Sequence, residues 1–367
     1  MSGCCGLSLA QGLKNVSLAA LRQRVSTFLT SNKPRAVADL VSGSQSGIAS
    51  IVYEQDDAPN SRTRDWNFSL HWAVPTLKSL VSTELFSRID STQVDPHQQP
   101  LETEILNMVN GATGEVLRSI PIPASYRMRR SKLKALLAEG IDVRYKKELQ
   151  NIRYSEDGET VTAQFGDGTI ASGCLLVGVD GSRSRTRNLL LGPKEAALSP
   201  IPYAASFVQC QYSREQALFL RKSFRLFVAA IHPLGLFSWF GLHDVPDPDR
   251  PETWIFYTYI SYPSSIQEQS ETADWTNAMK MEHLKGMAKD FADPWKSAYA
   301  WMPADQPVWQ HGMTSWDPST RGHRWEMSGG RVTLGGDAAH PMTYRPSFPP
   351  SQPFHRLILS RFMLTKS

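Results

Sequence analysis

The middle of the chain alternates hydrophobic and polar positions in the manner of β-strands. Three aromatic-rich runs of this kind cover residues 224–233, 235–245 and 253–263. Because alternation puts the apolar side chains of a strand on one face, these runs predict an antiparallel sheet with one covered face. Residues 272–303 are rich in Met and Trp, and we expect them to form helices that pack over this sheet.

The segments around this sheet follow a different pattern, in which strands alternate with helices. A helix with three leucines on one face is predicted at residues 126–140, and its final glycine is typical of a helix end. Residues 141–181 predict a meander of short strands followed by a buried strand, and a leucine-rich helix comes next. This order indicates an α/β core with a meander attached.

Residues 16–46 interrupt the α/β pattern. The segment is rich in Ser and basic residues, and it could form one amphipathic helix followed by a linker. A connection of this length is unusual within a strand–helix–strand unit, so we expect either a surface insertion or translated non-coding sequence. The sequence of the transcript would distinguish the two.

Composition narrows the class of protein. The 367 residues are 41% hydrophobic and 20% charged, which is ordinary for a soluble protein of two or three domain-sized units. The net charge of +4 is spread along the chain, which does not indicate nucleic acid but suits anionic ligands such as dinucleotides.

The apolar stretch from Leu226 contains His232 and Pro233, so we expect no transmembrane segment. The four cysteines lack CxxC spacing and the N-terminus lacks signal-peptide features, which favours a cytoplasmic protein with reduced thiols.

Residues 331–341, RVTLGGDAAHP, contain a candidate ligand-binding site. Gly336, Asp337 and Ala338 follow a short predicted strand. The N-terminus of a helix at this place would present free backbone N–H groups, and the carboxylate could hold a hydroxyl-bearing ligand such as a polyol phosphate. An ordinary capped helix start is the alternative interpretation.

An earlier turn has a related composition. Asp180, Gly181, Ser184 and Arg187 follow the buried strand that begins near Cys174. An acid, a glycine, a hydroxyl and an arginine at this spacing can hold a hydroxyl and a phosphate at a strand-to-helix turn.

The N-terminal part of the chain contains a partial glycine fingerprint. Gly3 and Gly6 match the latter two-thirds of G-x-G-x-x-G, but Met1 stands in place of the first glycine and the preceding strand is missing. A flexible glycine-rich terminus is the alternative. Glu54 ends a predicted strand, as does the acid that binds ribose hydroxyls in such units, although it lies much farther from Gly6 than the usual roughly 20 residues.

Basic residues near these segments could meet a phosphate. Arg64 could reach back to a phosphate or remain solvated. Arg129 and Arg130 stand at the start of the helix predicted at 126–140, where one of them could pair with an anionic ligand.

These motifs occur in one order, and together they resemble the FAD-dependent aromatic hydroxylases, the class A flavoprotein monooxygenases similar to para-hydroxybenzoate hydroxylase. The turn at Asp180 and Gly181 matches the DG motif of that family, and Gly336 with Asp337 matches its GD motif. The R-x-x-L sequence that starts at Arg130 also recurs. The resemblance covers most of residues 1–14 and 47–345.

The resemblance implies an α/β (α+β two-domain) fold, with a Rossmann-like FAD-binding domain and an antiparallel β-sheet substrate domain. The implied divisions are a FAD-binding domain at 1–192 with the insertion at 16–46, a substrate domain at 193–330, a return to the FAD-binding domain at 331–345 and a divergent tail at 346–367. The implied FAD contacts are Gly3 and Gly6 beside the pyrophosphate, Glu54 at the adenosine ribose, Arg130 at the pyrophosphate, Asp180 near the diphosphate, Asp337 at the ribityl hydroxyls and Pro341 near the isoalloxazine edge.

The activity that the resemblance implies is hydroxylation of a small aromatic or similar electron-rich molecule, with NAD(P)H as transient co-substrate and O2 as the oxygen donor. The family places its substrate on the antiparallel sheet. Tyr257, Tyr259, His232 and His243 could therefore line a pocket, or they could be ordinary buried residues. No catalytic base is assigned, and neither a hydrolytic motif nor a metal-ligand spacing competes with this interpretation.

Two alternatives stay open at this point. One is a non-oxygenating FAD oxidoreductase of the same fold. The other is a truncated, catalytically impaired flavoprotein relative, which rests on the partial N-terminal motif, the insertion and the residues after Tyr344. There the family continues into a glycine-rich turn and a helix, whereas residues 346–350 of this chain contain three prolines and no glycine.

Overall fold

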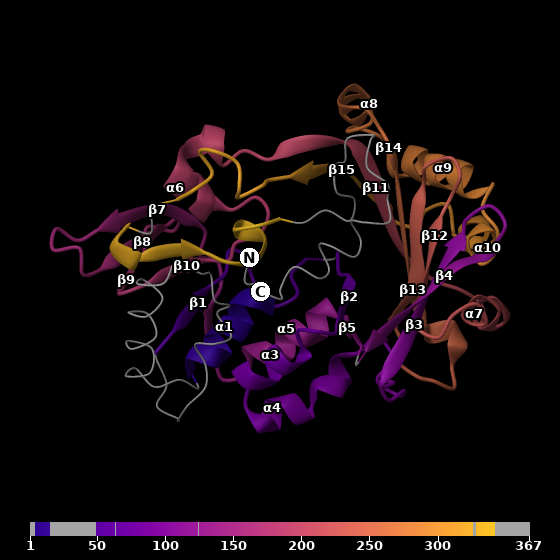
Figure 1. Cartoon of the computed structure of the whole chain (residues 1–367), viewed down its shortest axis with the longest axis horizontal. Helices are drawn as coiled ribbons and strands as arrows, with labels where there is room; N and C mark the ends of the chain where they lie inside the picture. Colours follow the sequence, from indigo (N-terminus) through magenta and orange to yellow (C-terminus); the bar gives the residue numbers. More distant parts are fainter. Residues whose placement is uncertain (1–3, 15–48, 63, 124, 326–327, 342–367) are drawn as a thin grey trace.

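The computed structural model describes residues 4–14, 49–62, 64–123, 125–325 and 328–341 (Figure 1). Gly3, the predicted insertion at 16–46 and the predicted tail at 346–367 lie outside the described residues. The described chain combines a large mixed sheet with helices and smaller sheets, which confirms the predicted α/β fold class.

The large sheet has seven strands, and its middle is formed by the three runs that alternate in the sequence. The spatial order is β15 (Trp309–Ser315), β11 (Ser199–Gln211), β14 (Ile255–Pro263), β13 (Phe237–Asp244), β12 (Phe227–Ile231), β3 (Thr103–Asn110) and β4 (Val116–Pro123). Neighbouring strands are antiparallel except β12 and β3, which are parallel. The predicted antiparallel arrangement of the three central runs is confirmed.

Helices cover the outer face of this sheet, as the sequence predicted for residues 272–303 (Figure 1). They are α7 (Arg214–Arg221), α9 (Asn277–Ala288) and α10 (Trp295–Trp301), while α8 (Ile266–Glu271) contacts β11 and β15 at one edge of the sheet. Phe240, Phe256 and Ile260 of the sheet pack in one core with Leu284 and Trp295 of the helices. Burial of these large apolar side chains supplies the main stabilisation of this half.

The prediction of one covered face is wrong for the central strands. In β14 seven successive residues are buried, so both faces of the strand are covered. The second face packs with Trp66, which belongs to the part of the chain that precedes the sheet. Alternation in the sequence therefore marks two different buried environments.

The other half of the molecule contains small sheets and a cluster of helices. Its strands are β1 (Ile51–Tyr53) parallel to β6 (Asp142–Arg144), β10 (Leu176–Gly178) parallel to β16 (Val332–Leu334), β2 (Asn67–Leu70) antiparallel to β5 (Tyr126–Arg129), and the meander β7 (Leu149–Tyr154), β8 (Val161–Phe165) and β9 (Ile170–Gly173). The predicted meander is confirmed. Its helices are α1 (Cys4–Lys14), α3 (Val74–Leu80), α4 (Thr83–Ser87), α5 (Arg130–Ala138) and α6 (Arg185–Glu195), and its short 3-10 turns are η2 (Ile89–Thr92), η4 (Ser328–Gly330) and η5 (Gly336–Ala338). A further 3-10 turn, η3 (Pro251–Thr253), precedes β14 in the large sheet.

Helices α1, α3 and α5 pack together on a small apolar core. Leu7 of α1 and Leu77 of α3 contact the leucine face of α5 that the sequence predicted. A Cβ atom on Gly12 would lie 2.7 Å from Leu80 Cδ2, so the absence of a side chain lets α1 approach α3 closely.

One segment lies in a different sheet from the one its position in the sequence suggested. The sequence placed residues 103–123 inside the continuous unit 1–192, but β3 pairs with β12 and extends the large sheet. Val109 of β3 is buried in the core of that sheet. The unit 1–192 is therefore interrupted by this hairpin.

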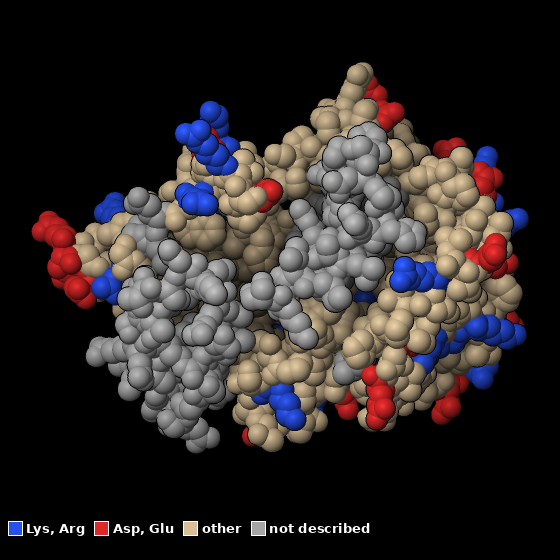
Figure 2. Space-filling view, viewed as in Figure 1, with Lys and Arg blue, Asp and Glu red and all other residues tan. Residues whose placement is uncertain are grey.

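Charged side chains form separate groups on the surface. On the face shown in Figure 2, Lys and Arg gather over the region of α6, and acidic side chains project from the tip of the β7–β8–β9 meander. Among the residues described, no helix has the length and apolar character needed to cross a membrane. The cytoplasmic location stays a prediction.

Candidate cofactor site

Strands β10 and β16 bring the DG and GD motifs together, although they lie far apart in the sequence. The strands are parallel, and Leu176 pairs with Val332 and Gly178 with Leu334. The ladder continues past the strand ends, because the Gly335 N–H donates to the Gly178 carbonyl at 2.9 Å. Both turns therefore follow the carboxyl ends of two neighbouring parallel strands, which is the usual place for a ligand in such sheets.

The N-terminus of α1 lies against both turns. A Cβ atom on Gly6 would lie 2.7 Å from Val179 Cγ2, and one on Gly336 would lie 3.3 Å from Cys5 Sγ. Gly336 also has φ +57°, which favours glycine. The free N–H groups at the start of this 11-residue helix thus share a location with the GD motif.

The DG turn is held by its own side chains. One carboxylate oxygen of Asp180 accepts from the Ser184 hydroxyl at 2.5 Å, and the other accepts from the Thr186 N–H at 2.8 Å. Ser184 caps α6 and accepts from the Arg187 N–H at 2.8 Å. Gly181 has φ +83°, which permits the tight turn. The described bonds of Asp180 and Ser184 therefore fix the shape of the turn.

Arg187 has a positioning role that the sequence did not predict. Its side chain is buried with 1% exposed, and its guanidinium donates to the carbonyls of Ser182, Ala196 and Ala338 at 2.5–3.2 Å. Burial lowers the pKa of this guanidinium, while Asp180 acts in the opposite direction. The sequence placed Arg187 among the ligand-binding residues, whereas the structure uses it to join the DG turn to the buried Ala338 of the GD motif.

Glu54 follows β1 and is completely buried. Its Oε1 accepts from the Asp56 N–H at 3.2 Å, and its Oε2 lies 3.7 Å from the Lys134 ammonium. The two side chains therefore form a buried ion pair. The sequence missed Lys134, whose one visible signal was its place one turn after Arg130 on α5.

Asp337 is exposed beside the start of α1. Desolvation raises the pKa of its carboxyl, while His340 and Arg130 act to lower it. Burial raises the pKa of Cys5, and the Asp337 charge adds to this shift. Burial also raises the pKa of Cys4 to about 11, against the influence of Arg130. These side chains therefore share one electrostatic environment.

The helix predicted after the GD motif is, within the described residues, the three-residue turn η5. Ala338 is buried and Pro341 is half-buried at the end of the described segment. Their predicted contacts with FAD stay predictions.

Arg64 and Arg130 extend over the same aromatic ring. Their guanidinium carbons lie 5.2 Å and 4.8 Å from the centroid of Trp66. The Arg130 N–H also donates to the Trp66 carbonyl at 3.0 Å, where α5 begins. Within the described parts of the chain, neither guanidinium forms an ion pair with a carboxylate. Desolvation and the neighbouring arginines lower the pKa of Arg64, although Tyr257 opposes this.

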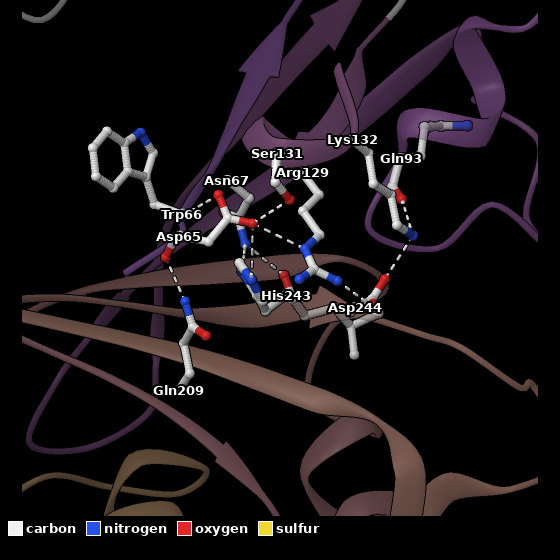
Figure 3. Close-up of polar contacts among 11 residues, drawn as sticks. Asp65, Trp66, Asn67, Gln93, Arg129, Ser131, Lys132, Gln209, His243 and Asp244 are labelled. Atoms are coloured by element: carbon white, nitrogen blue, oxygen red, sulfur yellow. Dashed lines mark hydrogen bonds and ion pairs between the residues drawn. The ribbon is translucent and has the colours of Figure 1, made fainter. Parts of the chain in front are cut away.

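Arg129 takes a different role from Arg130. It donates to Asp65 at 2.9 Å and to Asp244 at 2.5 Å, and so joins the start of α5 to the end of β13 (Figure 3). Ser131 donates to Asp65 at 2.5 Å and Lys132 donates to Asp244 at 2.7 Å. Among the described residues, Arg129 is thus the one of the two adjacent arginines that forms ion pairs, and the contact of Arg130 with a phosphate stays a prediction.

His243 lies beneath this network. The buried ring places Nε2 3.7 Å from Asp65 Oδ2, and it is stacked on Tyr257 with centroids 6.1 Å apart. Burial lowers the pKa of His243 to about 4, and Asp65 only partly opposes the shift. Desolvation would raise the pKa of Asp65, but hydrogen bonds from Ser131 and Arg129 prevail and lower it.

An aromatic face of the large sheet points toward the cofactor half. The ring centroid of Phe207 lies 4.9 Å from that of Tyr259 and 5.1 Å from that of His311, whose ring is nearly parallel to it. Tyr257 belongs to the same cluster. His232 does not belong to it. It packs on Phe291 at 4.7 Å on the helix-covered side, so its predicted place in a substrate pocket is wrong and the core alternative is confirmed.

Comparisons with known proteins agree on one class. No protein-family model matches the chain. The chain is 37% identical over 299 residues to the FAD-dependent monooxygenase cctM of Talaromyces islandicus, with 81% of this chain and 72% of that protein covered. It is 32% identical over 301 residues to the FAD-dependent monooxygenase phnB of Penicillium herquei, with 81% and 71% covered. Its fold is similar to that of Klebsiella pneumoniae HpxO in complex with FAD and uric acid, with a TM-score of 0.60, 18% identity, and 92% and 72% of the two chains covered.

Proposed function

This chain belongs to the FAD-dependent monooxygenases, and we propose that its FAD lies where α1 meets the DG and GD turns. The observation that carries the proposal is this convergence of three segments at one sheet edge. The residues present fit a dinucleotide, because the site offers helix N–H groups, a buried carboxylate, an exposed carboxylate and two guanidiniums that form no ion pair with any described residue.

Each part of FAD has a matching group in the proposed site. Glu54 accepts the ribose hydroxyls, Arg64 and Arg130 face the diphosphate, and Asp337 holds the ribityl chain. Pro341 lies toward the flavin ring. When bound, FAD supplies the redox chemistry by which NAD(P)H and O2 are consumed and one oxygen atom reaches the substrate.

The substrate class follows from the face opposite this site. Phe207 is half-buried and packs on the buried Tyr257 and Tyr259, and an aromatic cluster of this kind favours a planar, electron-rich aromatic molecule. The HpxO structure holds uric acid, which is a planar ring, and this supports the proposal. Tight packing of these rings would also exclude water from the reacting atoms.

The test uses purified protein, FAD and a panel of phenols. We expect bound flavin absorbance, NAD(P)H oxidation stimulated by an accepted phenol, and O2 uptake coupled to a hydroxylated product. Asp337→Ala should weaken FAD binding about tenfold, whereas Asp142→Ala, at an exposed ion pair, should not change it.

Two results would count against the proposal. If the protein retains no bound flavin after incubation with FAD and removal of the free FAD, the proposal is wrong. NAD(P)H oxidation that never consumes O2 would instead support a non-oxygenating FAD oxidoreductase.

A further inference from the structure

We propose that Trp66 is a positioning residue that holds Arg64 and Arg130 as a pair directed at one diphosphate group. The inference rests on the proposed function, because it takes the FAD diphosphate as the ligand of the two arginines. It adds a residue that neither the glycine, DG and GD motifs nor the comparisons point to.

The geometry places two cations on one ring. The guanidinium carbons of Arg64 and Arg130 lie 5.2 Å and 4.8 Å from the Trp66 centroid. Both distances are within the roughly 6 Å over which a cation is attracted to an aromatic face, and Trp is the strongest of the aromatic residues in this respect. The indole therefore attracts two groups that repel each other.

No carboxylate among the described residues lies at ion-pair distance from this pair, although the charge of Asp337 interacts with Arg130 at longer range. Among the residues that the structure describes, Arg64 and Arg130 form no ion pair, although the adjacent Arg129 forms two. Two adjacent guanidiniums that no described carboxylate contacts directly favour a ligand that carries two negative charges. A diphosphate satisfies this requirement, while a single carboxylate would leave one positive charge unbalanced.

The backbone of Trp66 is held on both sides of its Cα atom. Its backbone N–H donates to the Asp65 carboxylate at 3.0 Å, and that carboxylate is held by Arg129 and Ser131 (Figure 3). Its backbone carbonyl accepts from the Arg130 N–H at 3.0 Å. Figure 3 shows the indole pointing away from the Asp65 network.

The ring also contacts the other half of the molecule. Trp66 is half-buried and packs with the aromatic cluster that contains Phe207 and Tyr257. This contact immobilises the indole between the aromatic face and the two arginines. Ordering the arginines before the ligand arrives reduces the entropy lost on binding.

The experiment compares the affinities of Trp66→Leu and Trp66→Phe for FAD and for riboflavin, which has the flavin and ribityl groups but no diphosphate. We expect Trp66→Leu to weaken FAD binding about tenfold, which corresponds to the loss of two cation–π contacts. Trp66→Phe should lie between it and the unsubstituted protein. Riboflavin affinity should not change in either variant.

Controls separate positioning from general loss of structure. Trp301→Leu removes a partly exposed tryptophan on α10 and should leave the FAD affinity unchanged. In the Arg64→Met/Arg130→Met background, Trp66→Leu should change the FAD affinity by less than about twofold, because the groups that it positions are gone. This comparison uses the affinity for FAD and does not need riboflavin.

The possible failures are distinguishable. If Arg64→Met/Arg130→Met leaves the FAD affinity unchanged, the proposed function has the wrong residues at the diphosphate. If that variant binds FAD more weakly but Trp66→Leu does not, the inference about Trp66 is overturned and the site stands. Equal weakening of FAD and riboflavin by Trp66→Leu would make Trp66 a structural residue and would also overturn the inference.

Discussion

Buried charges in this protein are arranged as partners, and Glu54 with Lys134 is the clearest case. Glu54 is completely buried and the side chain of Lys134 is 9% exposed, so each depends on the other for charge compensation. Their charged groups lie 3.7 Å apart, so each lowers the free-energy cost of burying the other. The proposed ribose contact would add a further partner to this carboxylate.

Lys134→Met should destabilise the protein by about 3 kcal/mol, because it leaves a buried carboxylate without its cation. Urea unfolding at pH 7 measures this. Glu54→Gln in the same chain should recover part of the loss, since no charge then remains. Lys296→Met, at an exposed position on α10, should have little effect. A loss below about 0.5 kcal/mol in Lys134→Met would show that the pair contributes little.

His243 should make the stability depend on pH. Its pKa in the folded protein is about 4, below the roughly 6.5 of an unfolded chain. The unfolded state therefore takes up the proton first as the pH falls, and stability present above about pH 6.5 is lost progressively down to about pH 4. Between pH 7 and pH 5 the unsubstituted protein should lose about 2 kcal/mol more than His243→Asn. Parallel unfolding curves for the two proteins would contradict the assignment.

At the scale of elements, the site depends on close approach of α1 to the DG strand. This approach depends on Gly6, because any side chain there meets Val179. The sequence suggested Gly6 as a residue close to a phosphate, and the structure adds a reason for glycine that concerns packing. A ligand contact and a helix contact can thus require the same residue.

Gly6→Ala should destabilise the protein by about 1–3 kcal/mol and weaken FAD binding, because the new methyl group displaces Val179. In the double variant, Val179→Ala should restore much of the lost stability and of the lost FAD affinity. The matched control is Gly286→Ala in α9, where the methyl group enters open space and should be neutral or stabilising. Thermal unfolding and FAD titration measure the effects. Equal behaviour of Gly6→Ala and Gly286→Ala would exclude a packing role for Gly6.

At the scale of the molecule, the two halves meet through a network of charges at the start of α5. Arg129 bridges Asp65 of the cofactor half and Asp244 at the end of β13. Gln209 of β11 also donates to the Asp65 carbonyl. The residues that hold Arg64, Trp66 and Arg130 in place are thus anchored to the large sheet.

Arg129→Met should destabilise the protein by about 3 kcal/mol, because two partly buried carboxylates lose a shared partner. It should also weaken FAD binding through the displaced start of α5. Arg144→Met removes an exposed pair with Asp142 and should have little effect on the stability. Denaturant unfolding without FAD measures the change in stability, and the additional stabilisation in the presence of FAD measures the change in FAD binding. Equal losses in the two variants would remove the special role of the network.

The sequence predicted those parts of the fold that depend on local patterns. Alternation identified the three central strands and the meander, and the motifs identified the segments that converge at the site. The pairing of β3 with β12 was not predictable, because a parallel register between distant strands leaves no local pattern. Arg187 and Arg64 were given similar roles since both are arginines near a motif. Burial and hydrogen bonding distinguish Arg187, which is buried and donates to three carbonyls, from the exposed Arg64.

The pairing of β10 with β16 has a consequence for how the protein is made. These strands enclose most of the large sheet between them in the sequence. A ligand that requires both turns therefore cannot bind until the intervening chain has folded and brought its ends together, a step that carries a loop-closure cost. In refolding experiments, flavin binding should be the last signal to appear, after the tryptophans of the large sheet are buried. Each bound FAD would then mark a chain whose folding is complete.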